Sequence, residues 1–438
     1  MHILVRKHLT FTFRLCALLA VLISSARSQT NTENFAQFRF NFNNPGARAT
    51  GLGGAFISIA DDATAAEANP AGLTTLLRPE VSLEGKGIQF TTRVQNFSST
   101  GTDPNFQSVS REFKNSIFSP SFATVVFPFR KFTFSAFRYE LVNFESAFFT
   151  EGASLLTSQG ATHFFPVKSS TKLKVVNWGG SAAYKISNEF SLGVSGGVSA
   201  ISMNSSLTRY LLAVFNDGVI ANSATIDDTG TDFFINVGLI YKPTDKFSVG
   251  VVYKQRPSFD LHHSFRIVLN PRDSIENKSI HFRVPSSIGI GLSYRPTDVL
   301  TLAFDVVRIQ YSSLTKDMVL TISQDAASAA DFTVDNGFEV HGGAEYVTFI
   351  GTMGLVFRAG AYLEPDNRIR WVGNVNDSSD PDRIFSRELL AALFKKGDSY
   401  VHGTFGVGVV ISDNFQFDVA GNISSVTKEA VGSLVVRF

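Results

Sequence analysis

Short segments in which every second residue is hydrophobic recur along most of this chain. In SIGIGLSY (287–294), isoleucine, leucine and tyrosine alternate with serine and glycine, and similar alternation occurs in 300–307, 403–411 and 415–420. Successive side chains of a β-strand point to opposite faces, so each segment has one hydrophobic face and one small or polar face. The pattern predicts an all-β fold.

The connections between these segments alternate between short and long. Six are short and contain the turn-forming residues Pro, Asn, Asp or Gly in most cases: 127–132, 185–190, 242–247, 295–300, 347–353 and 411–415. Seven are long and polar: about 98–113, 149–170, 206–230, 263–277, 313–334, 364–396 and 423–430. Outer-membrane β-barrels have short periplasmic turns and longer outer loops. Six turns and seven loops join fourteen antiparallel strands. Because this number is even, both termini of the chain lie on the periplasmic side.

The first 28 residues have the pattern of a cleaved secretory signal. Arg6, Lys7 and Arg14 precede an apolar run over 15–23, and small residues follow at a plausible cleavage point before Gln29. Nine apolar residues are too few to span a bilayer, which requires about 20. The alternative is a buried N-terminal helix. The only cysteine, Cys16, lies within this segment, so the mature chain would contain no disulfide.

Charge and composition narrow the class of protein. Removal of the four basic residues of the signal from 39 leaves 35 against 38 acidic residues, which is no electrostatic footprint for nucleic acid. The 42 phenylalanines, together with the secretory signal and the loop pattern, favour a transmembrane β-barrel over 80–438. An open sheet cannot span the membrane, because each unpaired backbone group in hydrocarbon costs several kcal/mol. We place five aromatic residues in the interfacial girdle: Trp178, Tyr184, Tyr241, Tyr253 and Tyr294.

Residues 29–79 differ from the strands that follow, which begin near Glu80–Phe90. GLGGAFISIADDATAAEANPAGL (51–73) is rich in Gly and Ala, and we expect Asp61 to cap a helical turn that Asn69-Pro70 ends. A fourteen-stranded barrel is too wide for side chains of its wall to fill. We therefore predict that 29–79 is a hatch that plugs the lumen; the alternative is a disordered periplasmic tail.

At these residues the sequence resembles the FadL-like outer-membrane transporters, which take up long-chain fatty acids and aromatic hydrocarbons. The resemblance lies in GARATGLGGAFISIADDATAAEANPAGLTTLLRPE (46–80), in the strand–turn–strand units at 239–261 and 283–312, and in the last strands with the terminal Phe438. It implies a fourteen-stranded barrel, a hatch in which Asn69, Pro70 and Ala71 rearrange, and a sideways exit at a kinked third strand. The terminal strand also resembles the signal read by the barrel-assembly machinery.

The third strand departs from that pattern. Residues 131–149 contain no Gly or Pro to mark a bulge, so Asn143 is the expected position of the break. The lateral opening is therefore implied by the resemblance alone.

Strand parity assigns candidate residues to the lumen. The charged positions are Asp305, Glu345, Arg358 and Asp418, which we expect to pair with Arg48, Asp61, Asp62 or Glu67 of the hatch. The apolar positions are Phe137, Tyr139, Phe234, Ile240 and Tyr362, which are typical of a wall that binds an apolar ligand or packs on the hatch. No metal, cofactor or nucleophile motif occurs, and we expect no enzymatic activity.

The leading hypothesis is passive uptake of hydrophobic small molecules across the outer membrane of a Gram-negative cell. Apolar residues in 110–119 and a short amphipathic helix at 387–396 would collect them outside. The alternative is a protein-interaction or shuttle component of a secretion system, a role served by related barrels. A general water-filled porin fits poorly, because a hatch would block it.

Overall fold

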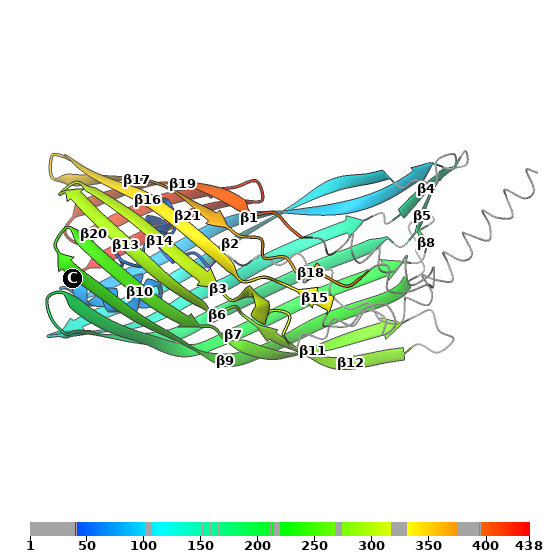
Figure 1. Ribbon diagram of the computed structural model, residues 1–438, viewed down its shortest axis with the longest axis horizontal. Helices are drawn as coiled ribbons and strands as arrows, with labels where there is room; N and C mark the ends of the chain where they lie inside the picture. Colours follow the sequence, from blue (N-terminus) through cyan, green and yellow to red (C-terminus); the bar gives the residue numbers. More distant parts are fainter. Residues whose placement is uncertain are drawn as a thin grey trace, which may run out of the picture.

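The computed structural model describes residues 40 and 42–438, apart from 101–106, 151–152, 158–159, 165, 211, 214–219, 268–273, 317–330, 375–393 and 395. Its main feature is a closed β-barrel of fourteen antiparallel strands (Figure 1). Two of the fourteen are interrupted, at 256–257 and at 284–286, and each carries two labels. The strands are β1 (Glu80–Thr100), β2 (Gln107–Phe129), β3 (Phe132–Thr150), β6 (Val167–Lys185), β7 (Phe190–Tyr210), β9 (Ile220–Thr244), β10 with β11 (Phe247–Gln255, Ser258–Ile267), β12 with β13 (Ser274–Arg283, Ser287–Thr297), β14 (Leu300–Ile309), β16 (Gly337–Ile350), β17 (Met353–Glu364), β19 (Tyr400–Ser412), β20 (Phe415–Ile423) and β21 (Thr427–Arg437).

The barrel closes where its first strand meets its last. β1 and β21 pair antiparallel from Glu80 opposite Arg437 to Phe90 opposite Thr427, without a register shift. The chain end adds to this seam, because the Phe438 N–H donates to the Pro79 carbonyl at 3.0 Å. Closure removes the free strand edge that a membrane-spanning sheet cannot expose. The predicted fold class is confirmed.

All six predicted short turns are present, and all lie at the end of the barrel where β1 starts and β21 ends. The predicted long connection at 423–430 is wrong, since only three residues separate β20 from β21. Several strands are much longer than the apolar layer needs: β2 has 23 residues and β9 has 25, against about 10 required to span. Much of the sequence predicted as loop therefore continues the barrel wall beyond the membrane.

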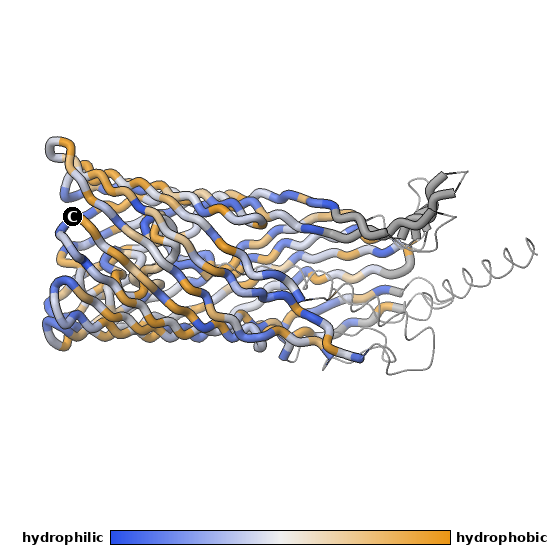
Figure 2. Tube along the Cα trace, turned by 45° about the horizontal axis from the view of Figure 1, so that its top comes forward, coloured by the Kyte–Doolittle hydropathy of each residue, from blue (hydrophilic) through white to orange (hydrophobic). Residues whose placement is uncertain are grey.

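Strand β9 shows where the membrane band ends. Its outward positions Phe233, Ile235 and Val237 are exposed and apolar, whereas the outward positions farther from the turn, Thr231 and Asp227, are exposed and polar. Figure 2 shows hydrophobic residues recurring along the strands near the short-turn end. Of the aromatic residues expected in the girdle, Trp178, Tyr184, Tyr253 and Tyr294 are exposed and Tyr241 is partly exposed. Within the described ranges, no helix is long and apolar enough to cross a membrane.

Short elements lie at the loop end of the barrel. β4 and β5 form a hairpin, β8 pairs with β5, and β15 pairs with β18 in a separate two-stranded sheet. Their bounds, with that of the 3-10 helix η2, are β4 (Ala153–Thr157), β5 (Gly160–Phe164), β8 (Leu212–Ala213), η2 (Tyr311–Ser313), β15 (Phe332–Thr333) and β18 (Arg370–Trp371). The amphipathic helix expected at 387–396 falls largely outside the described residues, as do the signal at 1–28 and the start of the predicted hatch.

The N-terminal segment, which we define as residues 42–79, crosses the inside of the barrel. Its helix α3 (Ala47–Gly51) contacts β17, β19, β20 and β21, whereas its 3-10 helix η1 (Pro70–Thr75) contacts β6, β7 and β9. Helix α4 (Ala65–Ala68) lies between them in sequence, and its residues are all buried. The segment therefore reaches opposite sides of the wall (Figure 1).

Two local expectations for this segment have different outcomes. The helical turn ends at Ala68 and Asn69 is extended (φ −157°, ψ 103°), because the following proline disfavours the helical conformation. Asp61 does not cap that turn, however. Its carboxylate binds Arg48, and it is Asp62 that accepts from the Thr64 N–H at 2.9 Å.

Candidate functional site in the barrel lumen

Asn69 and Pro70 pack directly against glycine residues of the barrel wall. The Asn69 side chain donates to the carbonyls of Ile57 (2.9 Å) and Leu239 (3.3 Å) and accepts from the Ala71 N–H (3.2 Å). A Cβ at Gly238 would lie 2.0 Å from the Asn69 Oδ1 atom, so only glycine permits this approach. Asn69 thus ties the N-terminal segment to itself and to β9 at once.

Next to Asn69, a buried carboxylate joins the same segment to the neighbouring wall. Glu67 is fully buried and accepts from Asn236 (2.9 Å) and Arg256 (2.9 Å), with Lys254 at 3.6 Å. A buried charge is tolerated only where it is paired and hydrogen-bonded, and here three residues of the barrel wall surround one acid. Arg256 lies at the interruption between β10 and β11, so one partner of Glu67 comes from an irregular part of the wall.

On the opposite side of the lumen, an ionic chain fixes helix α3. Arg48 binds Asp61 (2.5 Å) and Glu345 (2.8 Å), Glu345 binds Arg358 (2.7 Å), and Arg358 binds Asp418 (2.6 Å). Asp62 also lies near Arg48, and burial raises the pKa of the Asp62 carboxyl above its ordinary value. Acidic and basic side chains alternate along this network, so each buried charge lies next to a charge of opposite sign.

Asp305 serves the segment differently from the other three lumen charges. Its carboxylate accepts from the backbone N–H groups of Phe56 (2.7 Å) and Ile57 (2.9 Å) and has no ion pair among the described residues. The structure therefore brings Glu345, Arg358 and Asp418 together in one network and places Asp305 apart from them. Among the expected partners in the segment, Arg48 and Asp61 belong to that network and Glu67 does not.

The five apolar candidates are all buried, and four of them belong to one apolar cluster, from which Tyr362 is absent. Phe137 and Phe234 meet edge to face, with ring centroids 6.0 Å apart. Tyr139 donates from its hydroxyl to the Asn43 carbonyl at 3.0 Å, so it packs on the N-terminal segment. Ile240 lies on β9 opposite Gly250, near the Asn69 contact, whereas Tyr362 belongs to a polar cluster on β17.

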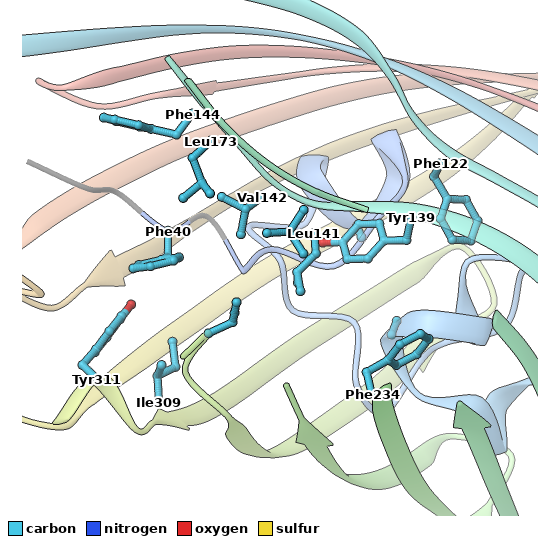
Figure 3. Packing of buried hydrophobic residues seen from close by; sticks show 14 of the residues in the cluster. Phe40, Phe122, Tyr139, Leu141, Val142, Phe144, Leu173, Phe234, Ile309 and Tyr311 are labelled. Carbon is cyan, nitrogen blue, oxygen red and sulfur yellow. The ribbon is translucent and has the colours of Figure 1, made fainter. Parts of the chain in front are cut away.

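The same apolar cluster continues toward the loop end of the lumen. Figure 3 shows side chains projecting toward one another from the wall, from the chain just before the N-terminal segment and from the loop after β14: Phe40, Leu141, Val142, Phe144, Leu173, Ile309 and Tyr311. Phe332, Trp371 and Phe394 of the outer connections belong to the same cluster. Buried apolar side chains therefore continue from the outer connections to β3.

At β3 the barrel wall is interrupted. β2 and β3 pair only from Phe129 opposite Phe132 to Phe122 opposite Tyr139, and over the described residues beyond this point the β2–β3 ladder does not continue. β2 goes on pairing with β1, and β3 with β6. We call the unpaired stretch, 114–121 of β2 and 140–147 of β3, the window. Phe118 stands at its outer side with 82% of its surface exposed.

Side chains occupy the window in place of backbone hydrogen bonds. Ser119 donates to Glu140 at 2.6 Å, Asn143 donates to Glu140 at 2.9 Å and to Ser119 at 3.2 Å, and Lys174 lies 3.2 Å from Glu140. Behind them, Phe90 of β1 packs against Phe144 of β3 with centroids 5.4 Å apart. The window is thus closed by a polar cluster outside an apolar one.

The expected break at Asn143 is two residues away from the observed irregularity. The β3–β6 register shifts between Glu140 and Val142, leaving Leu141 as the extra residue. A second shift in β1–β2, between Glu84 and Gly85, makes Ser121 an extra residue next to Pro120. Proline cannot donate to a ladder and within sheets belongs at edges or bulges, so Pro120 was a signal in the second strand that the sequence reading missed.

Other lumen residues were also missed by sequence reasoning. Lys254 and Arg256 pair with Glu67. They follow Tyr253 in the sequence and are not part of a recognisable motif. No group of three His, Cys, Asp or Glu side chains in the described part of the chain is arranged to hold a metal ion.

Comparisons with known proteins agree with this architecture. A family model described as outer membrane protein transport protein (OMPP1/FadL/TodX) matches residues 27–368. A Pseudomonas aeruginosa FadL homologue is 14% identical with a TM-score of 0.61, and its structure aligns over 91% of this chain and 99% of its own. The Ralstonia pickettii toluene transporter TbuX (16%, TM-score 0.58) and the Pseudomonas putida toluene transporter TodX (13%, 0.56) align over the same shares. A search of curated proteins gave no match. The chain belongs to the OMPP1/FadL/TodX family of outer-membrane transport proteins.

Proposed function

We propose that this protein is a passive channel for hydrophobic small molecules, such as long-chain fatty acids or aromatic hydrocarbons. The observation that carries the proposal is the apolar cluster that ends at the window. A ligand that leaves water at the outer connections meets Tyr311 and Phe40, then Phe144 and Leu141 at the interrupted wall. A concave path with apolar walls and few polar groups is typical of sites for apolar ligands.

The N-terminal segment then acts as the hatch, and the window as the exit. The segment fills the short-turn half of the lumen and is held by Arg48, Glu67 and Asn69, so direct passage to the periplasm would require their contacts to break. The window needs only side-chain movements of Ser119, Glu140 and Asn143. We therefore assign the window as the main route into the bilayer and Asn69, Pro70 and Ala71 as the element whose rearrangement widens the path.

The test is gene-dependent uptake of an apolar compound. Cells that lack other members of the family would be given radiolabelled dodecane, toluene or a long-chain fatty acid, with and without the gene. We expect the initial rate of uptake of at least one of these compounds to rise severalfold with the gene. Equal rates for all of them would remove the proposal, and capture of a secreted protein by the same cells would point to the secretion role instead.

A further inference from the structure

A polar cluster lies on the barrel wall next to Phe40 and Phe90 of the apolar cluster. Tyr362 is stacked between two histidines, with ring centroids 5.1 Å from His341 and 4.2 Å from His402. The three side chains come from β16, β17 and β19, and all are buried. Their hydrogen bonds tie the wall to the N-terminal segment, since Asn43 donates to the Tyr362 hydroxyl at 3.0 Å.

Both imidazoles have acceptors at both ring nitrogens. His341 faces the Gly53 carbonyl at 2.7 Å and the Glu339 carboxylate at 3.3 Å. His402 faces the Asn422 side-chain oxygen at 3.0 Å and the Glu364 carboxylate at 2.9 Å. A ring nitrogen that faces an acceptor must carry a proton, unless the facing carboxyl group carries one. One proton therefore lies between each histidine and its glutamate. Neither imidazole has an N–H left for a ligand.

A small cavity opens between this cluster and the apolar path. It has a volume of about 20 Å³, and its lining residues are Phe40, Asn43, Phe90, Glu339, Tyr362, Glu364, His402 and Thr427. A volume of this size holds about one water-sized polar group. The two phenylalanines belong to the same apolar cluster as Phe144, so a molecule with its polar end in the cavity has its apolar part in the path.

The charges around the cavity are unsuited to an anion. None of the side chains that line it, within the described residues, is a lysine or arginine. Lys86, on the adjacent β1, pairs with Glu429 at 3.4 Å, and Asn422 also donates to Glu429 at 2.9 Å. A carboxylate placed here would lie beside Glu339 and Glu364 with no lysine or arginine of the lining to pair with, and a buried charge without such a partner is unfavourable. A carboxylate also has two oxygens where the cavity has room for about one.

We propose that this cavity binds the hydroxyl end of a hydrophobic alcohol or phenol and disfavours carboxylates. The hydroxyl would donate to Glu339 or Glu364, whose oxygens each have more than one lone pair, and its apolar part would lie against Phe40 and Phe90. This inference rests on the proposed function and narrows its substrate class from hydrophobic compounds in general to neutral, hydroxyl-bearing ones.

The test compares three probes of equal chain length in the wild-type full chain: dodecane, 1-dodecanol and dodecanoate at neutral pH. We expect gene-dependent uptake of dodecanol to exceed that of dodecanoate by about tenfold or more, the factor that corresponds to about 1.4 kcal/mol. Equal or faster uptake of dodecanoate overturns the inference while leaving the proposed function in place. Absence of gene-dependent uptake for all three overturns the inference, and uptake of toluene then decides whether the proposed function stands.

A variant then locates the preference. Replacing both acids (Glu339→Gln with Glu364→Gln) keeps their shape and removes their charge, and should reduce the dodecanol preference at least about threefold. The matched control is Glu112→Gln, an exposed acid paired with Arg93 on the outer wall, which should leave the preference unchanged. An unchanged preference in the folded double variant overturns the assignment of this cavity. If the double variant does not fold, the wild-type comparison with the three probes still decides the substrate class.

Discussion

Two sides of the same barrel wall are closed in different ways. Around β16, β17, β19 and β20 the ladders are continuous along the lumen, and the Arg48–Glu345–Arg358–Asp418 chain anchors the N-terminal segment to them. At β2 and β3 the ladder ends after Phe122 and Tyr139, and Ser119, Glu140 and Asn143 close what remains. One side is held by backbone hydrogen bonds and buried ions, the other by a few side chains.

The difference indicates which side can move. Opening a ladder in the bilayer exposes unpaired backbone groups, each at a cost of several kcal/mol, whereas a side-chain hydrogen bond contributes only about 0.5–1.5 kcal/mol net. At the window β2 and β3 are already unpaired in the closed structure, next to the bulges at Leu141 and Ser121. Opening the window therefore breaks no further β2–β3 backbone hydrogen bonds. In the proposed route, the ionic side would keep the N-terminal segment in place while the side chains of the window move.

The largest effect should come from locking the window. Cysteines in place of Ser119 and Asn143, whose side chains meet at 3.2 Å, should form a disulfide across it in a chain whose Cys16 has been replaced. We expect oxidation to abolish gene-dependent uptake of an apolar compound and reduction to restore it.

The matched control places the cross-link in the seam that is already closed. Ser82 and Val435 lie opposite each other in the β1–β21 ladder, and both side chains are buried. Cysteines there should cross-link without changing uptake. Full uptake through the oxidised window variant would show that ligands leave elsewhere.

A smaller effect, on stability, should follow from breaking the ionic side. Arg358→Met leaves the Asp418 carboxylate without its cation and removes one of the two cations of Glu345. Loss of one partner of a buried pair costs about 3–5 kcal/mol, and we expect the free energy of unfolding in urea to fall by about that amount. Arg93→Met, in an exposed pair with Glu112, should cost less than about 1 kcal/mol. Similar losses in both variants would contradict the role given to the buried chain.

The sequence predicted the regular parts of this molecule well. Period-two alternation and short turns such as KPTDKF determine the number of strands, because a barrel repeats one rule in every hairpin. The rule fails where strands run past the membrane. Residues such as Asp227 and Thr229 are polar and fell within the connection predicted at 206–230, although the barrel wall continues through them. Hydrophobicity marks the lipid band and not the end of a strand.

The lumen was less predictable, because its contacts join residues far apart in the chain. Strand parity placed Glu345, Arg358 and Asp305 inward, but parity does not say that Glu345 pairs with both Arg48 and Arg358 while Asp305 binds backbone N–H groups. The bulge in β3 was expected at Asn143 and lies at Leu141, since it depends on a register set by β6. Pro120 was the one local signal of the interruption, and it stands in β2.

The smallest effect should come from loosening the window without breaking the wall. Glu140→Ala removes the acceptor shared by Ser119 and Asn143, while the ladders that flank the window remain. Each lost hydrogen bond contributes about 1 kcal/mol net, so we expect the free energy of unfolding to fall by less than about 2 kcal/mol. Local opening should become more frequent, so amide exchange over 115–121 should be about tenfold faster, and that over 431–436 in the β1–β21 seam unchanged. Glu145→Ala, on the same strand and paired with Lys172 at the surface, provides the control. Equal acceleration at the window in both variants, or in the seam as well, would mean that the side chains at β2 and β3 do not form a separate closing element.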